Sequence, residues 1–283
     1  MAPIVLFIYI VLLVLIFSIS YKLFFYPWVP LLPKQLQKIK FLYYGHRGSP
    51  LVSPENTLLS FQEAIDNSMD GIELDVQLTK DQKLVIYHDE YINYNNSIVK
   101  ISNLTLAEIN QIDARNNFNE LSFQKIPELD EVLNILPHNM ILNIEIKSYG
   151  WDMFNNKIER QLLSVIDDKI NYNQLIISSF NPLVIKRIKE LNSSISIALI
   201  WSKKSYKWFT FGIVSNYKLF AYYSKPDVFH VNIKDVNQSM INWFSKRNIQ
   251  LYAYTVNTKS DLEKAKKYNL SGIFTDDPKI KNV

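Results

Sequence analysis

The stretch GIELDVQL at residues 71–78 decides the fold class, because apolar and acidic side chains alternate along it. Successive side chains of a β-strand point to opposite faces, so the apolar residues share one face and Glu73 and Asp75 share the other. In a parallel barrel the apolar face meets the outer helices, and the two carboxylates are therefore expected to point inward. Burying two like charges together is costly unless a cation compensates them. An oxygen-rich pair of this kind selects a hard divalent ion such as Mg²⁺, Ca²⁺ or Mn²⁺.

Short apolar runs alternate with amphipathic helical stretches on both sides of this strand, from Phe41 to the end of the chain. Alternating strands and helices imply a parallel sheet. Eight such strands in about 240 residues favour a closed barrel over an open sheet. We therefore predict an α/β fold, a TIM (β/α)₈ barrel that forms the catalytic domain over residues 41–283. Its strands are expected at residues 42–45, 71–78, 141–146, 175–179, 196–201, 228–232, 250–255 and 272–275.

The N-terminal stretch MAPIVLFIYIVLLVLIFSISY carries no charged side chain. About 20 apolar residues match the hydrocarbon thickness of a bilayer. Tyr21, Tyr26 and Trp28 suit its interface. A cleaved signal peptide would normally show a basic start, a shorter apolar core and small residues at its end. The sequence therefore predicts one N-terminal transmembrane helix at residues 1–21, and a single-pass protein with the membrane bilayer as a partner.

Residues 22–40 are expected to form a juxtamembrane linker, which three prolines interrupt. Lysines lie along it, and no acidic residue precedes Glu55. The positive-inside rule then predicts a catalytic domain that faces the cytoplasm. The linker lysines either rest on anionic lipid headgroups or are solvated, and the sequence leaves both interpretations open.

The composition is that of a globular protein, with 48% hydrophobic and 20% charged residues. The net charge of +4 is mild, whereas nucleic-acid binding would need a concentrated basic face, so nucleic acid is not expected as a partner. The absence of cysteine excludes disulfides, thiolate metal sites and a cysteine nucleophile. No protein partner can be inferred from the sequence.

Two polar runs, GHRG and PENT, follow the first predicted strand. In GHRG, His46 can exchange a proton near neutral pH, and Arg47 offers a planar fork of donors for a phosphate. In PENT, Asn56 is expected to cap a helix over residues 57–68. A helix start explains the proline and the asparagine of this run, but it does not explain why Glu55 should face the barrel mouth.

Two further strand ends add chemistry. His88 follows an apolar run that reads as a small additional strand. In LNIEIK, the alternation places Asn143, Glu145 and Lys147 on the inward face. Glu145 can complete the metal site, and Lys147 can neutralise a phosphate oxygen, although a structural salt bridge is the alternative. Carboxylates, histidines, an arginine and a lysine together are the groups that metal-assisted phosphoryl chemistry needs.

These runs occur in the order found in the glycerophosphodiester phosphodiesterase (GDPD) family, which the chain resembles from about residue 41 onward. The resemblance implies a TIM barrel that hydrolyses a glycerophosphodiester to glycerol 3-phosphate and an alcohol, with one divalent cation, Mg²⁺ or Ca²⁺. The matching runs are GHRG (45–48), PENT (54–57), GIELDVQLTKD (71–81), HDE (88–90), IPELDEVL (126–133), NIEIK (143–147), SSFNP (178–182), TVN (255–257) and GIFTDDP (272–278).

The resemblance also implies a role for each site residue. Tyr254 stands where family members often have tryptophan, and it still offers an aromatic wall. Neither the choice of acid between the two histidines nor the nucleophile, a water or a neighbouring substrate hydroxyl, follows from the sequence. The implied roles are Glu73, Asp75 and Glu145 for the metal, His46 and His88 for general acid and base, Arg47 and Lys147 for the phosphate, and Glu55 for support.

The substrate is expected to derive from a phospholipid. Membrane-anchored relatives of the lysophospholipase D type have a similar layout, which suggests a lysophospholipid cleaved to lysophosphatidic acid and an alcohol. The region 203–226 is rich in aromatic residues that either form an apolar lip or pack as a helix on the barrel. A non-catalytic, membrane-anchored lipid-binding barrel is the alternative function. Packing roles are expected for His138 and His230, although His230 could also point inward. The aromatic residues are Trp208, Phe209, Phe211, Tyr217, Phe220, Tyr222 and Tyr223.

Overall fold

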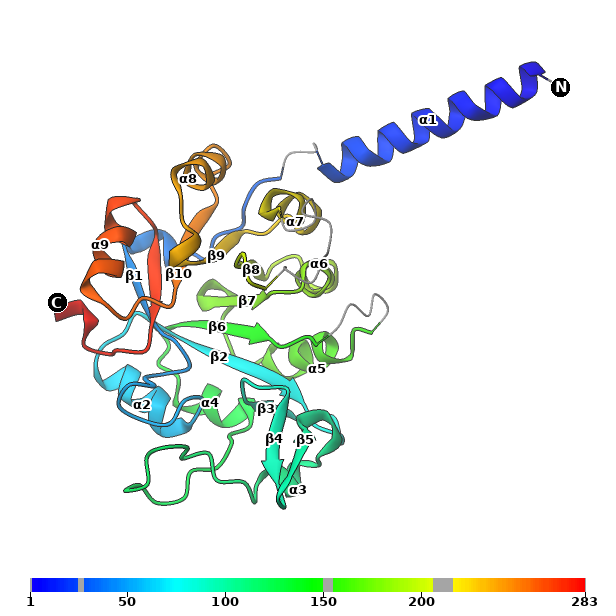
Figure 1. The fold of residues 1–283 in the computed structure, drawn as a ribbon. Helices are drawn as coiled ribbons and strands as arrows, with labels where there is room; N and C mark the ends of the chain where they lie inside the picture. Colours follow the sequence, from blue (N-terminus) through cyan, green and yellow to red (C-terminus); the bar gives the residue numbers. More distant parts are fainter. Residues whose placement is uncertain (1, 25–27, 150–154, 206–215, 283) are drawn as a thin grey trace.

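The computed structural model of the chain describes residues 2–24, 28–149, 155–205 and 216–282. Figure 1 shows a ring of strands surrounded by helices, with helix α1 projecting away from it. The ring is closed, because β1 pairs in parallel with β11 on one side and with β2 on the other. The parallel strands of the ring are β1 (Leu42–Gly45), β2 (Gly71–Leu78), β6 (Ile141–Ile146), β7 (Leu175–Ser179), β8 (Ser196–Trp201), β9 (Val228–Asn232), β10 (Gln250–Tyr254) and β11 (Gly272–Thr275).

The predicted TIM barrel is confirmed, with one difference in the strand bounds. Strand β10 ends at Tyr254, one residue before its predicted end. Helices follow the barrel strands and cover their outer faces (Figure 1). Polar side chains at the helix starts explain several of the boundaries; Asn181, for example, accepts a hydrogen bond from the backbone N–H of Leu183. The outer helices are α2 (Leu58–Asp66), α4 (Leu129–Ile135), α5 (Lys157–Ile166), α6 (Pro182–Leu191), α7 (Tyr217–Ser224), α8 (Gln238–Ser245) and α9 (Lys259–Lys267).

The alternation in β2 separates two environments, as predicted. Its apolar side chains pack into the core between the barrel and the outer helices, whereas Glu73 and Asp75 are buried on the inner side. The lower part of the barrel interior is a second, separate apolar cluster. It closes the barrel below the carboxylates, so the charged side chains lie nearer the C-terminal ends of the strands. The barrel-strand residues of this cluster are Leu42, Tyr44, Ile141, Ile176, Ala198, Val228, Tyr252 and Phe274.

A small subdomain lies between β2 and β6 and carries His88. Strand β3 (Leu84–Ile86) pairs antiparallel with β2, and a separate apolar cluster fills the subdomain. The subdomain places the backbone of Tyr87 in contact with that of Asp75, because the Tyr87 N–H donates to the Asp75 carbonyl at 2.9 Å. The remaining elements of the subdomain are β4 (Tyr91–Tyr94), β5 (Ser97–Lys100), the 3₁₀ turn η2 (Ile101–Asn103) and α3 (Leu106–Ile109).

The segment expected to be a linker packs against the barrel over much of its length. Leu36 belongs to the lower interior cluster and is only 1% exposed. Trp28 Nε1 donates to the carbonyl of Pro226 at 3.0 Å, and the N–H of Leu31 donates to Asp227 Oδ1 at 2.7 Å. The segment therefore closes the N-terminal end of the barrel, and apolar burial explains the leucines that the sequence places there.

Helix α7 decides between the two interpretations of the aromatic region for the residues that the structure describes. Tyr217 packs against Trp201, Phe229 and Phe244, and Phe220 is 8% exposed. These aromatic side chains therefore pack as a helix on the barrel and form no apolar lip. Tyr222 packs in the same way, against Trp28 and Trp243. Trp208, Phe209 and Phe211 lie outside the described residues.

Helix α1 (Ala2–Phe24) contains a stretch, Pro3–Tyr21, that is long and apolar enough to cross a membrane. None of that stretch is buried against the rest of the protein. A helix so apolar on every side suits a lipid environment.

Candidate active site

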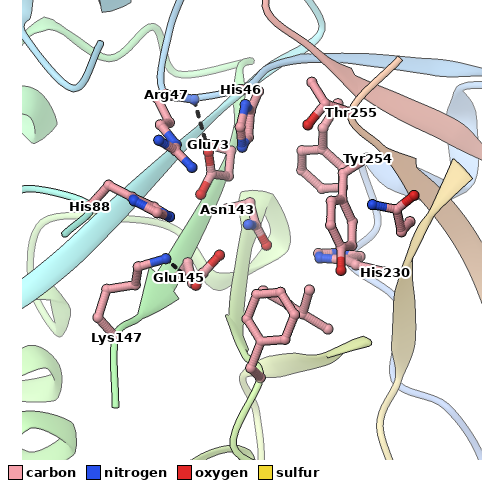
Figure 2. A pocket seen from close by; sticks show the side chains of 14 residues that line it. His46, Arg47, Glu73, His88, Asn143, Glu145, Lys147, His230, Tyr254 and Thr255 are labelled. Atoms are coloured by element: carbon pink, nitrogen blue, oxygen red, sulfur yellow. Dashed lines mark hydrogen bonds and ion pairs between the residues drawn. The ribbon is translucent and has the colours of Figure 1, made fainter. Parts of the chain in front are cut away.

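The candidate site is a pocket of about 230 Å³ at the C-terminal ends of the barrel strands (Figure 2). Charged residues in or just after β1, β2, β3 and β6 line one side of it, and largely aromatic and apolar residues in or just after β7 to β11 line the other. The lining residues are His46, Arg47, Glu73, His88, Asn143, Glu145, Lys147, Phe180, Ile200, His230, Asn232, Tyr254, Thr255 and Phe274.

The three predicted carboxylates converge at this pocket, which Glu73 and Glu145 line and beside which Asp75 is buried. Glu73, Asp75 and Glu145 each offer an oxygen atom, and these atoms lie within 4.8 Å of one another. Strand register explains the meeting, because Asp75 of β2 lies directly beside Glu145 of β6. All three residues are buried. Their convergence is as predicted, and their role as metal ligands stays a prediction.

The electrostatics of this cluster fit a divalent cation. Burial and the neighbouring charges of Asp75 and Glu145 raise the pKa of Glu73 well above its ordinary value. Burial alone would also raise the pKa of Asp75, but Lys147 and Arg47 outweigh it and hold that pKa below its ordinary value. Three carboxylates therefore face two cationic side chains, and the cluster as a whole is short of positive charge. All its donor atoms are carboxylate oxygens, which suit Mg²⁺ or Ca²⁺.

Arg47 is held in place by the turn that follows β1. Its backbone φ is +52°, and the following Gly48 has φ of +88°, where a Cβ would lie 2.4 Å from Ser60 Oγ. The turn directs the Arg47 N–H to Glu73 Oε2 at 2.8 Å. Its guanidinium Nη1 donates to both oxygens of Glu55 at 3.0 Å. Glu55 thus fixes the guanidinium at the pocket wall, which agrees with the supporting position expected for it.

Lys147 is buried against the same carboxylates. Its Nζ lies 2.7 Å from Glu145 Oε1 and 3.1 Å from Asp75 Oδ1. Burial alone would lower the pKa of Lys147, but the charges of Glu145 and Asp75 outweigh it and raise that pKa above its ordinary value. Lys147 therefore stays charged at neutral pH and can attract an anionic substrate group.

Each predicted catalytic histidine is anchored by a carboxylate. His46 Nδ1 lies 2.7 Å from Asp276 Oδ1, and His88 Nδ1 lies 2.7 Å from Asp89 Oδ1. Because Nδ1 is engaged in both rings, Nε2 is the nitrogen left for the pocket. Figure 2 shows both imidazoles beside the carboxylates. This arrangement suits proton exchange at Nε2.

Asp276 is a site residue that the sequence reasoning missed, although it lies within the GIFTDDP run. It also accepts a hydrogen bond from Asn257 Nδ2 at 2.5 Å. Burial alone would raise its pKa, but the hydrogen bond and charge of His46 hold the pKa of Asp276 below its ordinary value. One signal was available in the sequence. Asp276 directly follows the last strand, and that strand pairs with the first strand, after which His46 comes.

Asp276→Asn is expected to lower kcat by about 10- to 100-fold while KM changes much less, because the anchor of His46 is weakened and no substrate contact is removed. Steady-state kinetics on a glycerophosphodiester would measure both constants. Asp277→Asn is the matched control, since Asp277 Oδ1 accepts the backbone N–H of Lys279 and the Asp277 side chain makes no other hydrogen bond among the described residues. A loss confined to KM, or an equal loss in the control, would refute the anchoring role.

Asn56 was expected to cap helix α2, and this prediction is wrong. Thr57 is the N-cap, since its Oγ1 accepts the N–H of Ser60. Asn56 instead has φ of +57° and donates from Nδ2 to Asp75 Oδ2 at 2.8 Å. Threonine and asparagine are both good caps, so local preference could not separate two neighbouring candidates. The side chain of Asn56 orients a candidate metal ligand.

On the other side of the pocket, Tyr254 supplies the expected aromatic wall. Its hydroxyl donates to the carbonyl of Trp201 at 3.0 Å, and its ring meets that of Phe180 edge to face. His230 packs against Tyr252 and Phe274 as expected, and it also lines the pocket, the inward position that the sequence had left open. The packing role expected for His138 is wrong, because this residue is exposed, and it does not line the pocket either.

A TIM barrel that carries these groups at the C-terminal ends of its strands is of the class that acts on phosphate esters. The sequence model of the glycerophosphoryl diester phosphodiesterase family matches residues 46–280. The chain belongs to this family. It is 34% identical over 247 residues to a glycerophosphodiester phosphodiesterase of Caldanaerobacter subterraneus, covering 85% of this chain and 96% of that protein.

Solved structures agree with the fold. A glycerophosphodiester phosphodiesterase of Thermotoga maritima superposes with a TM-score of 0.67 at 25% identity, covering 86% of this chain and 97% of that one. A phosphodiesterase of Oleispira antarctica, solved in complex with the product sn-glycerol-3-phosphate, gives a TM-score of 0.73 at 23% identity. That comparison covers 87% of this chain and 98% of the other.

Proposed function

We propose that this protein hydrolyses glycerophosphodiesters to sn-glycerol 3-phosphate and an alcohol, and that it needs a divalent cation held by Glu73, Asp75 and Glu145. The observation that carries the proposal is the convergence of these buried carboxylates with two fixed cations and two anchored histidines in one pocket. Family membership supports the substrate class, as do the names of the relatives and the product bound by the Oleispira antarctica enzyme.

Each side chain has a role that follows from its position. Arg47 and Lys147 bind the anionic phosphoryl group, and their own carboxylate partners keep them oriented. A bound divalent cation would polarise a phosphoryl oxygen and neutralise charge on it. One histidine accepts a proton at Nε2 from the attacking hydroxyl or water, and the other gives a proton to the departing alcohol oxygen. The P–O bond to the alcohol breaks as the new P–O bond forms.

A panel of phosphodiesters, assayed with and without a chelator, tests the activity. The protein is expected to release glycerol 3-phosphate from glycerophosphocholine, to lose activity with the chelator and to regain it with added Mg²⁺ or Ca²⁺. Phosphorus NMR of the products separates direct hydrolysis from a route through a cyclic phosphate. No turnover of any phosphodiester with either metal would leave the alternative function, a non-catalytic lipid-binding barrel.

Metal binding is expected to stabilise the protein more at high pH than at low pH. Between the ordinary pKa of Glu73 and its raised value in the folded protein, the native state holds more protons than the unfolded state. Stability of the metal-free protein therefore falls as pH rises through that window. A divalent cation needs the ionised carboxylate, so it gains affinity over the same window.

Thermal melting from about pH 5 to about pH 8, with and without millimolar Mg²⁺ or Ca²⁺, would measure this effect. The increase in Tm on adding metal should grow with pH. The Glu73→Gln variant is the control, in which the metal-free melting temperature should depend less on pH. A metal-induced shift that shrinks as pH rises would contradict the prediction.

The N-terminal helix supports a further part of the proposal, anchorage in a membrane with a single span. Residues 3–21 are apolar enough to cross a bilayer, and their helix projects from the barrel, with its C-terminal end at Ile19 beside α6 and α7 (Figure 1). The basic segment after them favours a cytoplasmic catalytic domain. The full chain should stay with membranes after alkaline carbonate extraction and keep its N-terminal sequence. Release with a shortened N-terminus would identify a cleaved signal peptide instead.

A lysophospholipid is the second candidate substrate, and the apolar helix is the observation that favours it, since a membrane would bring the site to lipid. This proposal concerns the same pocket and the same bond. Activity on lysophosphatidylcholine that matches or exceeds activity on glycerophosphocholine supports it. A protein that cleaves only the soluble diester contradicts it.

A further inference from the structure

A second cavity, of about 380 Å³, lies where helix α1 meets the barrel, apart from the catalytic pocket. Ile19 of α1 contributes to one wall, and residues of α6 and of the end of α7 form the others (Figure 1). None of its described lining residues also lines the catalytic pocket. We call this cavity the α1 groove, and its wall includes Ile19, Lys186, Lys189, Glu190, Tyr223 and Lys225.

The chain itself ties this groove to the end of α1. Trp28 is fixed to the barrel, because its Nε1 donates to the carbonyl of Pro226 at 3.0 Å and its ring meets that of Tyr222 edge to face. Helix α1 ends at Phe24, and the chain from there to Trp28 spans at most about 14 Å. Pro226 directly follows Lys225, so the end of α7 lies close to the end of α1 by connectivity as well as by contact.

The length of α1 sets the depth of the groove relative to a bilayer. The apolar stretch Pro3–Tyr21 has 19 residues. At about 1.5 Å each they extend about 28 Å, close to the hydrocarbon thickness of about 30 Å. Ile19 is near the end of this stretch, so it lies at the edge of the hydrocarbon layer when α1 crosses the membrane. The lysines of the groove then lie at the level of the lipid headgroups, a step that rests on the proposed membrane anchorage.

The walls of the groove match a phospholipid at that level. Ile19 and the ring of Tyr223 offer apolar surface, and tyrosine is a residue that favours the membrane–water interface. Lys186 lies over this ring, with its Nζ 4.5 Å from the ring centroid. Lysine side chains at an interface keep their apolar stems on such surfaces and place their ammonium groups among the headgroups.

Positive charge predominates in the groove, since its described wall carries three lysines and one acidic residue, Glu190. Lys189 is already paired with the buried Asp227, at 2.8 Å. Lys186 Nζ lies 3.9 Å from Glu190 Oε1, and an exposed pair at this distance is weak, so a phosphate competes readily for this lysine. Lys225, at the end of α7, adds a second ammonium group. The groove therefore favours an anionic lipid over a zwitterionic one.

We infer that the α1 groove binds an anionic phospholipid of the surrounding bilayer. Its phosphate contacts Lys186 and Lys225. The upper part of an acyl chain packs against Ile19 and Tyr223. This lipid is not the substrate, because α6 begins at Pro182 at the pocket end of the barrel, and the groove extends from the middle of α6 to the far ends of α6 and α7. The bound lipid holds the α6 and α7 side of the barrel on the membrane.

Lipid binding to the full chain in a non-ionic detergent tests the inference, with native mass spectrometry as the measurement. The probe is phosphatidylglycerol, and phosphatidylcholine with the same acyl chains is the comparison. The wild type is expected to bind phosphatidylglycerol about 25-fold more tightly, because each lysine beside an anionic headgroup contributes about 5-fold. Lys186→Gln combined with Lys225→Asn should remove most of this preference. Asparagine is chosen for position 225 because it tolerates the backbone φ of +48° there.

The charge-matched control is Lys266→Gln combined with Lys267→Gln. Both lysines are exposed on α9, on another side of the barrel (Figure 1). This control should keep the wild-type lipid preference. Both double variants should keep the wild-type kcat/KM on glycerophosphocholine, since none of the altered residues lines the catalytic pocket. A thermal melt in detergent without added lipid establishes that each variant is folded.

Equal affinity of the wild type for the two lipids, or a groove variant that keeps the full preference, would overturn the inference. An equal loss in the α9 control would reject it too, as a general effect of surface charge. Displacement of the lipid by inorganic phosphate would show a phosphate site instead. Lipid binding needs no turnover, so a wild type that cleaves no diester but prefers phosphatidylglycerol loses only the proposed activity. Release of a shortened protein by alkaline carbonate would refute the anchorage, and the groove inference with it.

Discussion

Replacing Glu73 by glutamine is expected to lower kcat/KM for a glycerophosphodiester by about three orders of magnitude. The substitution keeps the shape of the side chain but removes one of the three carboxylates that converge within 4.8 Å. Charge stabilisation by a metal ion at a phosphoryl oxygen amounts to several kcal/mol, which corresponds to about 10³-fold in rate. Kinetics at saturating metal and a titration of metal affinity would measure the loss.

The same substitution should raise the melting temperature of the metal-free protein by a few degrees. Glu73 is buried next to Asp75 and Glu145, so its negative charge is unfavourable until a cation arrives. Glu263→Gln on the exposed side of α9 is the control, and it should change neither quantity. A Glu73→Gln variant that keeps more than a tenth of wild-type kcat/KM would show that this carboxylate holds no essential cation.

Replacing His46 or His88 by asparagine is expected to lower kcat on glycerophosphocholine by about 10²- to 10⁴-fold, the usual contribution of a general acid or base. Both rings have Nδ1 held by a carboxylate, so the geometry does not distinguish the acid from the base. A substrate with a p-nitrophenol leaving group distinguishes the general acid from the general base. Nitrophenolate departs without a proton, so the variant that lacks the acid should recover most of its rate on this substrate.

His138→Asn is the control for these substitutions, because its exposed side chain lies outside the pocket. Kinetics of both variants on both substrates would assign one histidine to each role. Near wild-type activity of His46→Asn on glycerophosphocholine would overturn its role. Equal loss of both variants on the nitrophenyl substrate would exclude a general acid among the two.

Most of the barrel could be predicted because strand patterning is local. The alternation in β2 requires only that apolar side chains meet helices, and the structure confirms the inward direction of Glu73 and Asp75. The helix that follows β1 was also predicted, although its cap was assigned to Asn56 when Thr57 holds that position. Asn56 and Thr57 are adjacent and have similar capping preferences, so local sequence does not separate them. The tertiary contact of Asn56 with Asp75 does.

Asp276 shows why part of the site could not be predicted. It contacts His46 across 230 positions of sequence, and nothing near Asp276 in the chain indicates that contact. The pairing exists because β11 closes the ring against β1. The place of His230 was left open for a related reason, since an inward position in a strand does not reveal whether the side chain ends in the apolar floor or at the pocket.

The residues from 28 to 40 and helix α7 show the same limit for packing. Prolines and lysines suggested a linker, yet Leu36 closes the end of the barrel. The described aromatic residues of α7 pack against neighbouring strands and helices. The sequence had also allowed the other interpretation, that these residues form an apolar lip. Composition indicates that apolar side chains must be buried, but it does not indicate which elements of the fold bury them.

The sequence by itself determined the class of fold, the positions of its strands, the inward direction of the acidic side chains and the apolar character of the N-terminal helix. These features depend on periodicity and composition over a few neighbouring residues. Only the tertiary structure decided which distant groups meet: Asp276 with His46, Asn56 with Asp75, and His230 with the other residues that line the pocket. Those contacts depend on ring closure and strand register, which bring together residues far apart in the chain.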